Sequence, residues 1–121
     1  VSHHENKEEN LAQYQHIAQW HIEQYAYLLN KLKQMPEGES NVLDHSMIMF
    51  GSGLRDGNRH SPRNLPLVIA GSAGGAIKTG QHLINDTNTP LSNLYCCMLK
   101  AFGTPVEKFA DSTELLPGVL A

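Results

Sequence analysis

Apolar residues recur at three- and four-residue steps through the first third of the chain. This spacing is typical of one face of an amphipathic helix, and it predicts a helix of about six turns. Pro36 and the polar residues 37–41 would end it. The apolar positions that define this face are Leu11, Tyr14, Ala18, Ile22, Tyr25, Leu28, Leu29 and Leu32.

Two short apolar runs follow, at residues 47–50 and 65–70. Neither alternates with polar residues, which is typical of strands that are buried on both faces, as in a parallel sheet. Residues 76–79 predict a short third strand. Pro90, with Thr89 as its cap, predicts the start of a second helix, which Gly103 would close.

These elements predict an α/β fold in which helices are layered on a small, mostly parallel sheet. A chain of 121 residues is long enough for a single domain, which we place at residues 1–121. Three short strands make a thin sheet for an independent domain. We therefore expect the chain to contribute part of a larger sheet, with a sheet edge through which copies could associate.

Composition narrows the classes of partner. A hydrophobic content of 40% and a net charge of -3 argue against intrinsic disorder. No run of Lys or Arg stands out, so we expect no nucleic-acid partner. No apolar stretch approaches the roughly 20 residues of a membrane span. Cys96 and Cys97 are adjacent, which fits neither a disulfide framework nor a zinc site.

Residues 52–64 form a long polar segment directly after the first predicted strand. Ligands bind at this end of the strands in open α/β sheets. Asp56 and His60 offer oxygen and nitrogen atoms to a metal ion. Arg55, Arg59 and Arg63 could hold a phosphate or sulfate group. A solvated loop with Asp-Gly and Gly-Asn turns is the alternative interpretation.

Histidine is frequent, with 7 in the chain. The neighbouring His3 and His4 could each supply one metal ligand, or they could belong to a disordered end or a tag remnant. His21 lies on the apolar helix face, where a core histidine is the better interpretation. His82 follows a glycine turn and could approach the polar loop.

A glycine-rich segment, residues 71–75, follows the second predicted strand. It matches neither the dinucleotide-binding fingerprint nor the P-loop. We interpret it as a turn that lets two backbones pass closely.

Several segments, in their order and spacing, resemble the C-terminal part of the bacterial HXXSHH family, a family of unknown function found in planctomycetes and related marine and soil bacteria. The resemblance covers nearly the whole chain and places Ser2-His3-His4 at the end of the motif that names the family. Members of the family usually look exported, which implies a periplasmic or extracellular location. The remaining segments are residues 21–27, 43–48, 51–60, 64–66, 70–71, 80–83, 90–94, 103–109 and 111–113.

A weaker resemblance connects the chain to the alkaline phosphatase and sulfatase superfamily. There a paired His/Asp motif, a helix, a buried strand and a polar metal-binding loop follow in the same order. This chain departs from the pattern, because Ser52-Gly53 stands where an Asp-His pair often follows the strand. The resemblance implies part of a larger alkaline-phosphatase-like sheet, with the nucleophile outside this chain.

Two functional hypotheses follow from these observations. In the first, the larger protein is a metal-dependent hydrolase of a small phosphate or sulfate ester, with zinc as the metal. Its metal ligands would be His3, His4, His60 and Asp56, and its anion-binding residues Arg55 and Arg59. In the second, the chain is a non-catalytic binding or assembly module with a degenerate hydrolase fold. We expect the isolated chain to be inactive in either case.

Overall fold

The computed structural model describes residues 3–86 and 88–121. Its longest element is helix α1, Glu8–Lys33. Glu8 and Glu9 lie in the first turn, and Lys31 and Lys33 lie in the last. The charges at both ends therefore interact favourably with the helix dipole. The predicted first helix is confirmed, and it begins one turn earlier than the apolar pattern indicates.

A tight hairpin follows α1, at residues that the sequence predicted only as the end of the helix. Strands β1, Pro36–Glu37, and β2, Ser40–Asn41, pair antiparallel. Gly38 lies between them with φ +60°, a conformation that glycine adopts without strain. The amide of Val42 then donates to the carbonyl of Met35, which returns the chain beneath the end of α1.

The central sheet has two strands, β3 (Ile48–Gly51) and β4 (Leu67–Ala70), which pair antiparallel from Ile48 opposite Ala70 to Gly51 opposite Leu67. The predicted mostly parallel sheet with layered helices is therefore wrong, and so is the larger alkaline-phosphatase-like sheet that the weaker resemblance implied. A parallel pair needs a crossover connection, usually a helix. The residues between β3 and β4 form no helix and return the chain directly.

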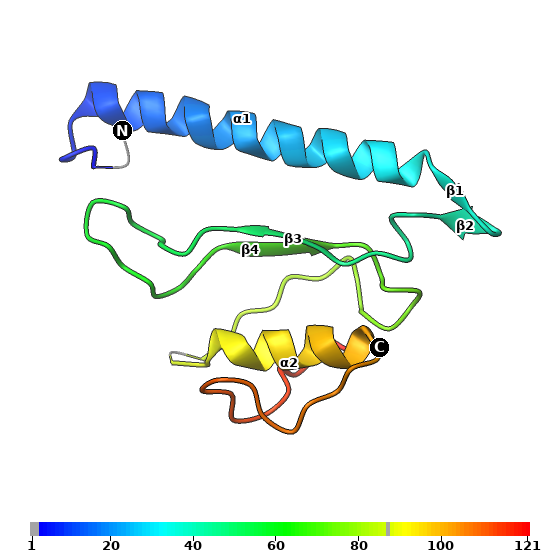
Figure 1. The fold of residues 1–121 in the computed structure, drawn as a ribbon. Helices are drawn as coiled ribbons and strands as arrows, with labels where there is room; N and C mark the ends of the chain where they lie inside the picture. The colour runs from blue at the N-terminus through cyan, green and yellow to red at the C-terminus, as the bar shows by residue number, and fades with distance from the viewer. Residues whose placement is uncertain (1–2, 87) are drawn as a thin grey trace.

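The sheet lies between the two helices (Figure 1). On the α1 side, the Tyr25 hydroxyl donates to the carbonyl of Ile48 over 2.7 Å. The Tyr25 ring stacks on Phe50, with centroids 5.1 Å apart. Burial raises the pKa of the Tyr25 phenol. These contacts attach the C-terminal half of α1 to β3.

The other face of the sheet packs on helix α2, Leu91–Ala101. Leu67 and Ile69 of β4 contact a core cluster of Leu94, Cys97, Leu116 and Val119. The C-terminal tail closes this core through hydrogen bonds from Ser92 to Asp111 and from Asn93 to Thr113. The second predicted helix is confirmed, but Pro90 occupies the N-cap position and no side chain caps it.

Two further predictions meet different outcomes. The predicted third strand at residues 76–79 is wrong, because only Ile77 pairs there, in an isolated bridge with Leu120. The predicted close backbone approach at the glycine-rich turn is confirmed at Gly71. This residue has φ +88°, and a Cβ there would collide with the carbonyl oxygens of Ser46 and Leu43.

Within residues 3–86 and 88–121, no helix combines the length and apolar character needed to cross a membrane.

Candidate functional site

The polar segment between β3 and β4 contains a compact turn centred on residues 55–61. The amide of Arg55 donates to the carbonyl of Ser61 over 2.8 Å, and the amide of Ser61 donates back to Asp56 over 3.1 Å. Inside the turn, Oδ1 of Asp56 accepts from the amides of Asn58 and Arg59, at 2.9 and 3.2 Å. The segment is therefore built around one carboxylate.

The hydrogen bonds to Asp56 also set its charge state. The backbone amide of Arg59 makes the largest contribution to a lowered pKa of this carboxyl. The amide of Asn58 and the positive charge of Arg59 act in the same direction. Asp56 is therefore held as a carboxylate, which is the form that accepts both amides.

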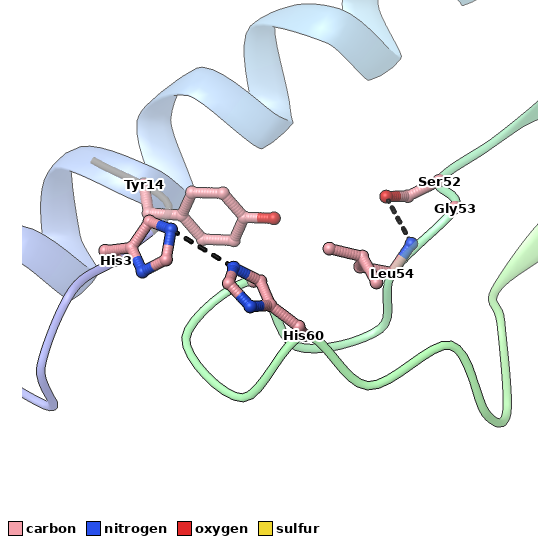
Figure 2. A pocket seen from close by; sticks show the side chains of 7 residues that line it. His3, Tyr14, Ser52, Gly53, Leu54 and His60 are labelled. Carbon is pink, nitrogen blue, oxygen red and sulfur yellow. Dashed lines mark hydrogen bonds between the residues drawn. The ribbon is translucent and has the colours of Figure 1, made fainter.

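The turn places His60 opposite His3 (Figure 2). Their Nε2 atoms lie 3.3 Å apart, and the two rings meet edge to face at 83°. His60 has φ +51°. This left-handed conformation reverses the chain, so that Ser61 can pair with Asp56. The sequence predicted both histidines as metal ligands, and the fold brings them together across 57 residues.

Hydrogen bonds hold the N-terminal segment against the same turn. The amide of Glu5 donates to Oδ1 of Asn58 over 3.2 Å. The amide of Lys7 and the side-chain amide of Asn10 both donate to the carbonyl of His4. His3 is thus positioned from two sides, by the polar turn and by the first turn of α1.

A cavity of about 290 Å³ opens beside the histidine pair. Tyr14 of α1 and Ser52 at the end of β3 supply hydroxyl groups to its wall (Figure 2). Sequence reasoning missed both as site residues. The helical pattern places Tyr14 on the apolar helix face, and Ser52 opens the polar segment 52–64 without a predicted role of its own. The full lining is His3, Tyr14, Ser52, Gly53, Leu54, Gly57 and His60.

The other predicted site residues lie around this cavity without lining it. Nδ1 of His4 accepts from the amide of Asn6 over 3.0 Å. Nε of Arg59 lies 3.8 Å from Oδ2 of Asp56, and its side chain is 77% exposed. Arg55 is exposed. Among the residues that the structure describes, no three His, Cys, Asp or Glu side chains are grouped closely enough to hold a metal ion.

Comparisons with protein-family models, characterised proteins and solved structures find no match to this chain. The resemblance to the HXXSHH family therefore stays a prediction.

Proposed function

We propose that His3 and His60 are two ligands of a divalent metal site, with zinc as the metal, and that the site serves hydrolysis of a small phosphate or sulfate ester. The observation that supports this proposal is the 3.3 Å separation of the two Nε2 atoms. Two nitrogen ligands about 2.05 Å from one tetrahedral zinc ion lie about 3.3 Å apart. The pair needs no change in separation to receive the ion.

Metal binding and a direct hydrogen bond make different demands on the two rings. In the hydrogen-bonded pair, one Nε2 carries the proton that lies between the rings. A metal ion requires both Nε2 atoms to be deprotonated. The ring that donates in the hydrogen-bonded pair must therefore carry its proton on Nδ1 when the metal binds. Both side chains are exposed, which leaves their Nδ1 atoms free to exchange protons with water.

Two histidines leave ligand positions open. His4 and Asp56 are the predicted candidates for these positions, and each now accepts hydrogen bonds from backbone amides. For His4, joining the metal through either ring nitrogen would break the bond to Nδ1, whereas Asp56 could bind a metal through Oδ2 and keep both bonds to Oδ1. Water or a residue beyond this chain competes for the same positions. A bound zinc ion supplies a water whose pKa is lowered to about 7, which provides hydroxide for ester hydrolysis near neutral pH.

The first experiment is calorimetric titration of the chain with Zn²⁺. We expect His60→Ala and His3→Ala each to lower zinc affinity at least about tenfold, because each removes one of two ligands. His82→Ala, which removes an exposed histidine outside the cavity, is the matched control and should bind as the wild type does. Absence of zinc binding by the wild type, or equal loss in all three variants, would contradict the proposal.

A second candidate function is assembly without catalysis. The observation that favours it is the surface of α1, which has no buried residue along its 26 positions. Trp20 and Tyr27 are 55% and 61% exposed, and Ile17 and Leu28 are also exposed. Such a face is suited to self-association. Zinc binding without zinc-dependent turnover of nitrophenyl phosphate or sulfate by the full-length protein would favour this second candidate.

A further inference from the structure

The cavity wall facing the histidine pair carries hydroxyl groups and no charged side chain. Tyr14 extends from α1, and its hydroxyl points toward the Ser52–Leu54 side (Figure 2). Ser52 follows β3 directly and lies across the cavity from the histidines. One ligand in the cavity could therefore contact both imidazoles and both hydroxyls.

The Ser52 hydroxyl is oriented by its own backbone neighbourhood. Its Oγ accepts from the amide of Leu54 over 3.3 Å. Because this bond uses a lone pair of the oxygen, the hydroxyl hydrogen stays available to a ligand. The Tyr14 phenol likewise carries one hydrogen to donate. The wall thus offers two hydrogen-bond donors at fixed positions.

Hydrogen-bond donors next to a cationic centre fit a ligand rich in oxygen acceptors. We propose that Tyr14 and Ser52 determine specificity by donating hydrogen bonds to a phosphate or sulfate group in the cavity beside His3 and His60. This inference rests on the proposed metal site, which supplies the positive charge. It also moves anion recognition away from Arg55 and Arg59, which the sequence favoured but which do not line the cavity.

The size of the cavity limits the ligand further. Pockets for small molecules usually measure about 300–1,000 Å³, so a cavity of about 290 Å³ is at the small end. It holds the oxyanion group and only a small substituent. A large aryl or nucleoside portion would lie outside it.

The test is calorimetric titration of the zinc-loaded chain with inorganic phosphate and, separately, with inorganic sulfate. A hydrogen bond to a charged group contributes about 1.5–3 kcal/mol, so we expect Tyr14→Phe to weaken anion binding by about tenfold or more. Ser52→Ala should weaken it in the same direction. Tyr27→Phe removes an exposed hydroxyl from the same helix and should have no effect. Stronger loss with phosphate than with sulfate would identify phosphate as the ligand, and the reverse would identify sulfate.

The outcomes separate the two proposals. Zinc affinity should be unchanged in Tyr14→Phe, since the phenol is not a ligand. If the wild type binds zinc and the anions bind Tyr14→Phe and Ser52→Ala as tightly as the wild type, this inference is overturned and the metal site stands. If Tyr14→Phe loses zinc as well as anion, Tyr14 supports the histidines rather than the anion, and the inference is again overturned. If the wild type binds no zinc, the proposed function fails and this inference fails with it.

Discussion

Asp56 is the residue on which the geometry of the polar turn depends. Its carboxylate accepts hydrogen bonds from the backbone amides of Asn58 and Arg59. These bonds fix the chain reversal at His60, which has a positive φ, and so place the His60 ring opposite His3. We predict that Asp56→Ala lowers zinc affinity about 10–100-fold, as is common when a group that orients a ligand is removed. Asp56→Asn keeps one acceptor oxygen and should lose less. Asp86→Ala, in another exposed loop, is the control in the same titration.

The same carboxyl makes the stability of the turn depend on pH. Its pKa is lowered in the folded chain, so the stabilisation it contributes is present above the usual pKa of an aspartate and is lost as the pH falls through the lowered value. The amide resonances of Asn58 and Arg59 should therefore shift in that acidic range in the wild type and not in Asp56→Asn. Identical shifts in both proteins would show that Asp56 does not hold the turn.

Single residues also show how far a sequence can predict a site. His3 and His60 were predicted because metal chemistry restricts the residue types, and the fold pairs them. Tyr14 was not predicted, because a helical period assigns a tyrosine to a face without saying where its hydroxyl points. Ser52 was not predicted, because serine after a strand is common, and only a cavity distinguishes it.

At the level of elements, the apolar runs predicted correctly where the two strands lie, but the parallel direction inferred from them is wrong. Residues 47–50 and 65–70 became β3 and β4 within two residues at each end. Their direction depends on the connection, whose turn forms through specific hydrogen bonds of Asp56 and Ser61 rather than through any hydrophobic pattern. The polar loop therefore joins two antiparallel strands and does not lie at the end of a parallel sheet.

The end of β4 gives a direct test of this packing. Gly71→Ala should lower the free energy of unfolding by more than about 1 kcal/mol, because a Cβ would enter the space taken by two carbonyl oxygens and would strain a positive φ. Gly75→Ala is the matched control, since Gly75 also has a positive φ, +95°, but open space around it. Urea denaturation of both variants measures the difference. A midpoint for Gly71→Ala equal to that of Gly75→Ala would mean that the approach of the backbones is not tight.

The β3–β4 sheet lies between an α1 half and an α2 half of the molecule (Figure 1). The α2 half holds the buried core, including Leu94 and Cys97. The α1 half holds the candidate site, with His3 and Tyr14 on the α1 side and His60 on the sheet side. The site therefore depends on α1 staying docked on the sheet, and Tyr25 makes the hydrogen bond and the ring stack that dock it.

This division predicts that stability and metal affinity respond to different substitutions. Tyr25→Ala removes both docking contacts, so zinc affinity should fall although Tyr25 does not line the cavity. Leu94→Ala should lower the free energy of unfolding by about 2–5 kcal/mol, the usual cost of truncating a core leucine. Below its lowered melting temperature, Leu94→Ala should still bind zinc with wild-type affinity. Equal loss of zinc affinity in both variants would mean that the halves do not act separately.

The docking contact also has a defined dependence on high pH. Because burial raises the pKa of Tyr25 above its usual value near 10, the phenol contributes stability that is complete below that pH. This stability is lost as the pH rises through the raised value, where ionisation removes the proton that Tyr25 donates to Ile48. Tyr25→Phe keeps the stack on Phe50 but has no proton to lose, so its melting temperature should fall less between pH values of about 9 and 11. If the melting temperature falls equally in the wild type and in Tyr25→Phe, the loss of stability at high pH comes from other groups. Ionisation of Tyr25 would then not control the docking of α1.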